Sequence, residues 1–243
     1  MTVRDLSGAE RAVETARGDD TRTRGAAPRC IAIDGPVASG KSAVGRLVAR
    51  ELGYRFIDTG LMYRAVTWLA IERKVDPADE TALARLAEGM RITIDGERVV
   101  VDGADVTDGL RSTGVGEAVS LVSRVPGVRD AMVARQREMA REGGAVMAGR
   151  DIGTVVLPDA PLKVYLDASP EERVRRRHAE LVALGRRETV DQVREELALR
   201  DAIDSGREVS PLRPAEDAII IHTDHLSVDE VVEQILEQVP CRS

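Results

Sequence analysis

The chain has 243 residues, with 42 acidic against 35 basic side chains and a formal net charge of −7 at pH 7. This balance argues against a general nucleic-acid-binding protein, and an aromatic content of 2% leaves too few rings to stack on single strands. Because no apolar run reaches 18 residues and two distant cysteines make no disulfide framework, we expect a cytoplasmic protein without membrane or nucleic-acid partners. We also expect this protein to act as a monomer.

The first 28 residues differ in composition from the rest of the chain. Residues 15–28 are polar, charged and glycine-containing, and they carry no residue of a recognisable catalytic motif. We therefore expect residues 1–28 to form a flexible tail that precedes a folded domain at residues 29–240.

A phosphate-binding motif follows the first predicted strand, at residues 31–34. The string GPVASGKS has the spacing G-x-x-x-x-G-K-S, with Gly35, Gly40, Lys41 and Ser42 in the fixed places. Its glycines let backbone N–H groups approach an anion, the lysine reaches the outer phosphates, and the serine hydroxyl can bind Mg²⁺. Apolar residues at helical spacing over 42–52 predict the helix that this motif requires. The alternative is a glycine-rich turn with a chance lysine, although the chain has only three lysines.

The remaining pattern alternates strands and helices. Beyond the first strand, we expect strands near residues 55–58, 144–151, 160–169 and 218–224. We expect helices at residues 61–74, 78–90, 115–123, 127–141, 169–185, 188–204 and 227–239. Residues 91–107 alternate apolar and polar side chains around two Asp-Gly turns, which predicts a small antiparallel meander. The fold class is therefore α/β: a parallel sheet with helices on both faces, interrupted by an insertion.

Residues that can bind phosphate follow the strands of this sheet. Ligands of open parallel sheets bind beyond the carboxyl ends of the strands, where GPVASGKS, DTGLMYR (residues 58–64) and GRDIGT (residues 149–154) should meet. Arg64 and Arg150 offer guanidinium groups for a second phosphate, and Tyr63 can pack along a base or a sugar.

The helix near residues 169–185 contains the most basic run, RVRRRH (residues 173–178). It is either a solvated helix face or an arginine lid that closes over transferring phosphates. Farther along, Arg200, Asp204 and Arg207 share one helix face if that helix lasts so long; alone, the spacing indicates an ordinary ion pair. The three histidines are too dispersed for a metal set, and none is assigned as a catalytic base.

Together these stretches resemble the bacterial cytidylate kinase family of nucleoside monophosphate kinases. The resemblance covers about residues 31–239 and rests on AIDGPVASGKS, DTGLMYRA, the meander, AGRDIGTVVLPDAPLKVYLDAS and the RDAIDSGR segment. It implies a P-loop kinase core at residues 29–85 and 143–240, an acceptor-binding insertion at about 86–142 and a helical lid at about 172–190. It also implies phosphate transfer from ATP, with Mg²⁺, to CMP or dCMP.

The resemblance assigns roles residue by residue. The ATP phosphate loop would comprise Gly35, Pro36, Val37, Ala38, Ser39, Gly40, Lys41, Ser42 and Ala43, with Lys41, Arg176 and Arg177 catalytic and Ser42 a metal ligand. Acceptor-binding residues would be Thr59, Tyr63, Arg64, Ser120, Arg129, Arg150, Asp151, Arg200, Asp204 and Arg207. Among these, Ser120, Arg129 and Asp151 would recognise cytosine, Arg64, Arg150 and Arg207 the acceptor phosphate, and Arg200 and Asp204 the sugar.

Three other classes of protein fit the sequence less well. An adenylate or shikimate kinase would share the phosphate loop, but the meander and the Arg129/Asp151 pair argue against it. A GTPase needs an Asn-Lys-x-Asp stretch to recognise guanine, and the chain has no asparagine. A catalytically dead nucleotide-binding module is disfavoured because Lys41, Ser42 and the arginines are all present.

Overall fold

The computed structural model describes residues 30–239; the predicted tail at residues 1–28 lies outside this range. The main sheet comprises β1 (Cys30–Asp34), β2 (Arg55–Asp58), β6 (Ala145–Gly149), β7 (Leu162–Asp167) and β8 (Ile219–His222). A second sheet comprises β3 (Ile92–Asp95), β4 (Arg98–Val101) and β5 (Ala104–Asp105). The α-helices are α1 (Lys41–Leu52), α2 (Thr59–Glu72), α3 (Glu80–Gly89), α4 (Thr113–Ser123), α5 (Pro126–Arg141), α6 (Pro170–Ala183), α7 (Val190–Ser205) and α8 (Val228–Glu237).

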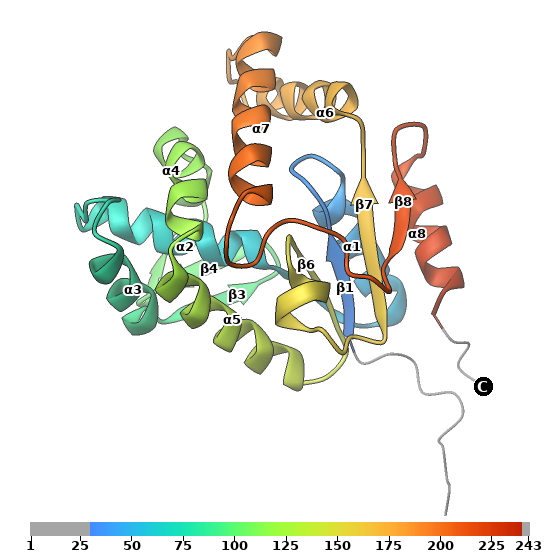
Figure 1. The fold of residues 1–243 in the computed structure, drawn as a ribbon, viewed down its shortest axis with the longest axis horizontal. Helices are drawn as coiled ribbons and strands as arrows, with labels where there is room; N and C mark the ends of the chain where they lie inside the picture. The colour runs from blue at the N-terminus through green and yellow to red at the C-terminus, as the bar shows by residue number, and fades with distance from the viewer. Residues whose placement is uncertain (1–29, 240–243) are drawn as a thin grey trace, which may run out of the picture.

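The five strands of the main sheet are all parallel, in the order β2-β6-β1-β7-β8, which confirms the predicted α/β class. Successive side chains of β1 point to opposite faces of the sheet, and both faces are covered by helices. Ile31 and Ile33 pack with α1 and α8 on one face, whereas Ala32 packs with the end of α5 and the turn after β6 on the other. Because the strands are parallel, their carboxyl ends share one edge, which faces α6 and α7 in Figure 1.

The segment between β2 and β6 forms a second body beside this sheet (Figure 1). Its apolar cluster joins α2, α3, β4, α4 and α5, with Met62, Leu83, Val99 and Met132 fully buried. The antiparallel meander is confirmed, with turns at Gly96 and Gly103 in the left-handed region. The same cluster includes residues of α2 and α3 that precede residue 86. This packing does not mark where the insertion begins, so its predicted boundary at about residue 86 stays a prediction.

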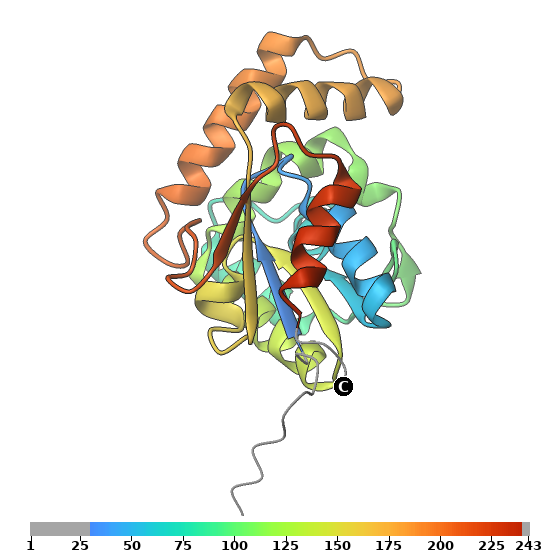
Figure 2. The ribbon, with the colours of Figure 1, turned by 90° about the vertical axis from the view of Figure 1, so that its right-hand side faces the viewer.

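Helices α6 and α7 form a hairpin across the carboxyl edge of the sheet, as Figure 2 shows from the side. Ser169 caps α6 and Pro170 occupies its first turn, as the sequence predicts. A small apolar cluster, Val174 and Leu181 against Val193 and Leu197, joins the two helices. The buried Arg173 guanidinium also pairs with both oxygens of Asp201 on α7, at 3.1 and 2.6 Å.

Two details differ from the sequence prediction. The residues after β6 form a short π-helix, Ile152–Val156, that no periodicity announced. Helix α7 ends at Ser205, so Arg207 lies beyond it and the predicted i, i+4, i+7 face does not exist as such. Within residues 30–239 no helix is both long and apolar enough to cross a bilayer.

Candidate active site

The loop between β1 and α1 has the backbone geometry of an anion cradle. Gly35 has φ +147°, and a Cβ there would lie 2.1 Å from the Leu166 carbonyl oxygen, so only glycine lets the loop pass β7. Gly40 has φ +96° and immediately precedes α1. The positive end of α1 and its free N–H groups therefore face the space above the sheet.

Lys41 is 9% exposed and its ammonium group lies within the loop. It donates hydrogen bonds to the Pro36 carbonyl and, at 3.4 Å, to the Ser39 hydroxyl. Burial, with a further contribution from the nearby Arg150 guanidinium, lowers the pKa of Lys41 to about 7. The nearby carboxylates therefore do not fully stabilise the charged ammonium. This is expected for a group whose charge is neutralised by a bound phosphate.

The Ser42 hydroxyl and the Asp58 carboxylate place two oxygen atoms that could bind a metal ion side by side next to the phosphate loop. The Ser42 hydroxyl donates to Asp58 Oδ2 at 2.7 Å, while Asp58 Oδ1 accepts from the Gly60 N–H at 3.0 Å and caps α2. Asp58 is not among the site residues predicted from the sequence, although an aspartate at a strand end before a helix is a recognisable cap. Among residues 30–239, no cluster of three or more His, Cys, Asp or Glu could hold a metal ion.

A cavity of about 290 Å³ extends from the phosphate loop toward α4 and α5. It brings together most of the predicted site residues. Those lining it are Val37, Ala38, Lys41, Ser42, Thr59, Tyr63, Arg64, Ser120, Arg129, Arg150, Asp151, Arg177, Arg200, Asp204 and Arg207. The predicted residues that do not line it are Gly35, Pro36, Ser39, Gly40, Ala43 and Arg176.

One end of the cavity holds a buried ion pair. The Arg129 guanidinium donates to Asp151 and, at 3.2 Å, to the Ser123 carbonyl, and it lies 5.4 Å from the centre of the Tyr63 ring. Arg129 is 2% exposed and Asp151 4%. The Ser120 side chain is also buried and lines the cavity. This end thus presents donors and acceptors side by side in apolar surroundings.

Asp34, which the sequence analysis did not single out, fixes the backbone next to this pair. Its two carboxylate oxygens accept hydrogen bonds from the Ile152 and Gly153 N–H groups, at 2.8 and 2.7 Å. Burial raises the pKa of Asp34 to about 6, although the two N–H groups oppose the rise. The carboxylate ties the π-helix to β1 and so sets where Arg150 and Asp151 emerge from β6.

The middle of the cavity is lined by arginines that share one carboxylate. Asp204 is 2% exposed and accepts from both Arg150 and Arg207, so Arg207 reaches the site despite lying beyond α7. Burial would raise the pKa of Asp204, but these two guanidinium groups hold it below its usual value. Burial and then Arg150 lower the pKa of Arg200 to about 10, while burial and Arg177 lower that of Arg64.

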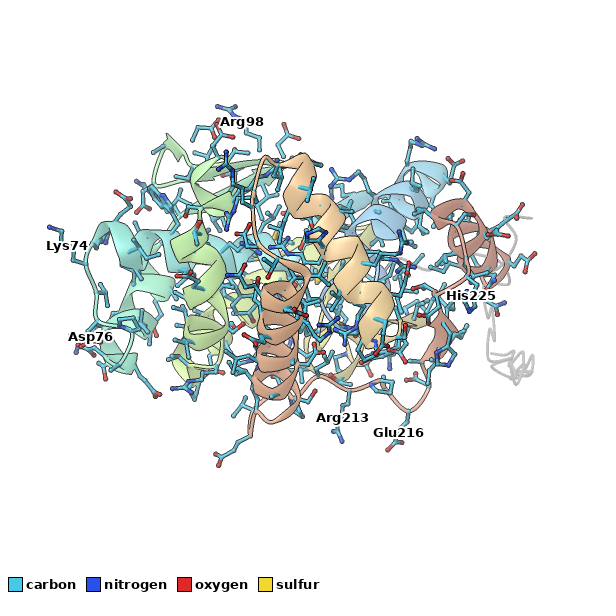
Figure 3. The ribbon with its side chains drawn as sticks, turned by 90° about the horizontal axis from the view of Figure 1, so that it is seen from above. Lys74, Asp76, Arg98, Arg213, Glu216 and His225 are labelled. Atoms are coloured by element: carbon cyan, nitrogen blue, oxygen red, sulfur yellow. The ribbon has the colours of Figure 1, made fainter. Side chains whose placement is uncertain are left out.

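The arginines of α6 differ in their surroundings. Arg177 lines the cavity and pairs with Glu180 at 2.9 Å. Arg176 instead donates to the Thr223 hydroxyl and carbonyl, at 2.9 and 2.6 Å, and its guanidinium lies near Gly40 of the phosphate loop. Arg175 points to solvent, and its guanidinium pairs with Glu172. Charged residues labelled in Figure 3, among them Arg98 and Arg213, lie at the periphery of the molecule in this view, and neither of these two arginines lines the cavity.

A phosphate loop at the edge of a parallel sheet, joined by one cavity to a second cluster of arginines, defines a P-loop phosphotransferase, an enzyme of the kinase class. The chain belongs to the cytidylate kinase family, whose model matches residues 31–241.

Relatives from several bacteria support this assignment, and each is named cytidylate kinase. The Geobacillus sp. (strain WCH70) protein is 53% identical over 211 residues, which is 85% of this chain and 94% of that protein. The Pelotomaculum thermopropionicum protein is 52% identical over 86% of this chain and 95% of its own length. The Bacillus subtilis (strain 168) protein is 48% identical over 88% and 97%.

Proposed function

We propose that this cavity transfers the terminal phosphoryl group of ATP to CMP and dCMP, giving ADP and CDP or dCDP. The observation that carries the proposal is that one cavity joins the phosphate loop at Lys41 to the Arg129–Asp151 pair. Donor phosphates and an acceptor base can thus be held at opposite ends, with the acceptor phosphate between them.

The donor end is built from the loop backbone and Lys41. Backbone N–H groups at the start of α1 would hold the ATP phosphates, and the Lys41 ammonium would leave Pro36 and Ser39 for the transferring group. The Ser42 hydroxyl and Asp58 carboxylate are hard oxygen ligands of the kind that suits Mg²⁺ bound mainly through phosphates. When bound, that ion would neutralise charge developing between the outer phosphates.

The acceptor end separates cytosine from uracil by hydrogen bonding. The Asp151 carboxylate can accept from the exocyclic amine of cytosine and repels the carbonyl that uracil carries there. Arg129 can donate to the ring acceptors, and Ser120, which lines the same cavity, can offer its hydroxyl to the base. Arg64, Arg150 and Arg207 would bind the acceptor phosphate, which would compete with Asp204 for two of them. Arg200 and Asp204 are the nearest polar groups for the sugar.

The chemistry needs positioning and charge neutralisation more than a strong base. Arg177, from the cavity roof, and Arg176, beside the phosphate loop, would bring positive charge to the migrating phosphoryl when α6 and α7 close. We assign this closing element to residues 172–190.

A coupled ADP-release assay with ATP and a panel of CMP, dCMP, UMP, AMP and shikimate tests the proposal. We expect CMP and dCMP to give the highest kcat/KM values. A preference for AMP or shikimate would replace it by the activity of another P-loop kinase, and no turnover with any acceptor would indicate a binding module.

A further inference from the structure

Gln136 is a buried polar residue to which the proposed function assigns no task. It is 1% exposed, on α5, and neither its amide nitrogen nor its amide oxygen has a hydrogen-bond partner among residues 30–239. A buried amide without partners is costly, and an apolar side chain of the same size would avoid the cost. Its presence on the core face of α5 therefore points to a partner that it engages during function.

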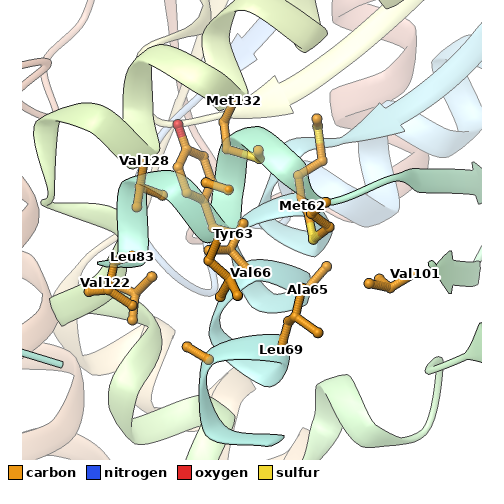
Figure 4. Packing of buried hydrophobic residues seen from close by; sticks show 14 of the residues in the cluster. Met62, Tyr63, Ala65, Val66, Leu69, Leu83, Val101, Val122, Val128 and Met132 are labelled. Atoms are coloured by element: carbon orange, nitrogen blue, oxygen red, sulfur yellow. The ribbon is translucent and has the colours of Figure 1, made fainter. Parts of the chain in front are cut away.

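The location of Gln136 connects it to the base end of the cavity. Arg129, Met132 and Gln136 are spaced i, i+3 and i+7 on α5, and all three are buried on one face. The Tyr63 ring lies against Val128 and Met132 of this face, and its hydroxyl points away from Val66 and Leu69 (Figure 4). Side chains on a helix lean toward its N-terminus, which directs Gln136 back toward this ring.

The Tyr63 hydroxyl is the best candidate for the partner of the Gln136 amide. This hydroxyl is also buried and without a hydrogen-bond partner among the described residues. Burial raises the pKa of Tyr63 to about 12, and the Gln136 amide lies close enough to oppose this rise. Even so, no hydrogen bond of acceptable geometry joins the two groups. A small rotation of either side chain would pair an amide N–H donor with a phenolic oxygen.

We infer that Gln136 is a positioning residue that sets acceptor selection through Tyr63. With an acceptor bound, its amide would hold the Tyr63 hydroxyl. The Tyr63 ring would then support the Arg129 guanidinium, which lies 5.4 Å from the ring centre, against the base. This inference rests on the proposed function and adds to it a residue that touches neither nucleotide.

A double-mutant cycle with Gln136→Met and Tyr63→Phe tests the inference. Methionine keeps the length and unbranched shape of glutamine, and phenylalanine keeps the ring. We expect each single variant to lower kcat/KM for CMP about three- to tenfold, mainly through KM, which corresponds to one net hydrogen bond. The CMP/UMP ratio should shrink and the KM for ATP should stay unchanged. Because both variants remove the same contact, the double variant should lose no more than either single one.

Met132→Leu is the matched control, since it changes packing one turn earlier on the same face without a polar atom. It should leave the CMP/UMP ratio unchanged. Melting temperatures and the calorimetric Kd for CMP are measured for every variant, and a removed unpaired amide should not lower Tm. The inference would be overturned if Gln136→Met left the CMP kinetics unchanged, or if the double variant lost activity by the product of the two single losses. It would also be overturned if the variants lost activity equally with CMP and UMP while their Tm fell. A wild-type enzyme without preference for CMP would instead overturn the proposed function.

Discussion

The Arg129 guanidinium and the Asp151 carboxylate form an ion pair that is almost completely excluded from solvent, at the end of the cavity opposite Lys41. The two residues are 22 positions apart in sequence, and their pairing joins α5 to the segment that follows β6. A buried pair is weak evidence for stability, because desolvation offsets much of the attraction. Under the proposed function, the pair serves to select the base, because it lines the end of the cavity where the base would bind.

We predict that Asp151→Asn reduces kcat/KM for CMP much more than for UMP. Asparagine presents an N–H group that can donate to the uracil carbonyl, and it removes the charge that repels this carbonyl. Sites built to hydrogen-bond one group often discriminate by orders of magnitude, so the CMP/UMP preference should shrink by at least about tenfold. Steady-state kinetics with both acceptors at saturating ATP measure this change, and the KM for ATP should stay near its wild-type value.

The alternative role of Asp151 is purely structural, as the counter-ion of Arg129. Breaking a buried pair by removing one partner costs about 3–5 kcal/mol, and the neutral amide should retain part of the pairing. In that case the melting temperature would fall while the ratio of CMP to UMP activity stayed the same. Thermal denaturation of the same preparation therefore separates the two roles.

The arginines of α6 supply a second prediction. Alanine at Arg176 or Arg177 should lower kcat alike for every acceptor, because these side chains lie beside the phosphate loop and in the cavity roof, away from the base end. Arg175→Ala is the matched control on the same helix, since the Arg175 guanidinium is exposed and pairs with Glu172. Equal losses in all three variants, or a loss confined to CMP, would contradict the assignment.

The third prediction concerns ligand binding and stability. Arg64 and Arg200 have lowered pKa values because they are buried near other cations, so an anion should relieve the repulsion. CMP at 100 times its Kd adds about 2.7 kcal/mol, which raises Tm by about 5–10 °C for a chain of this size. Arg150→Ala should reduce this shift, whereas Arg98→Ala, at the periphery of the molecule in Figure 3, should not. Differential scanning fluorimetry measures both, and equal shifts in the two variants would show that Arg150 does not bind the ligand.

Much of the fold was predictable because its local signals agree with one another. The period of apolar residues, the Asp-Gly turns of the meander and the Ser169-Pro170 start of α6 each gave the correct element. The parallel sheet was predictable from the alternation of strands and helices along the chain. The π-helix at Ile152–Val156 could not be predicted, since a long-range contact holds it: Asp34, on β1, accepts its first N–H groups.

The site was predictable where a motif fixes spacing and less so where tertiary contacts choose the partner. Lys41 and Ser42 follow from the phosphate-loop pattern, and Arg64 and Arg150 from their places after strands. In contrast, the contacts of Arg173 with Asp201 and of Arg176 with Thr223 join residues that are 28 and 47 positions apart in sequence. Nothing in RVRRRH indicates that its first arginine, Arg173, is buried and its second, Arg175, is exposed.

The fourth prediction is that Lys41→Ala lowers kcat by about 10²–10³. Removing one preorganised charge aimed at a transferring group typically has an effect of this size. Alanine also frees the Pro36 carbonyl and the Ser39 hydroxyl, so the fold is checked by circular dichroism and Tm. A correctly folded variant with wild-type turnover would exclude Lys41 from the chemistry.

The last prediction follows from the pKa of Lys41, which burial lowers to about 7 from 10.5. Since the folded protein then binds fewer protons than the unfolded chain between pH 7 and 10.5, Lys41 opposes folding most below pH 7, and this cost fades as the pH rises through that window. Triphosphate beside the amine should raise its pKa again, so ATP binding at pH 8 should take up close to one proton. Calorimetry in buffers of different ionisation enthalpy measures this uptake directly. Lys41→Met is the control, and the uptake should vanish in it; equal uptake in both proteins, or none in the wild type, would mean that Lys41 is already charged in the empty site.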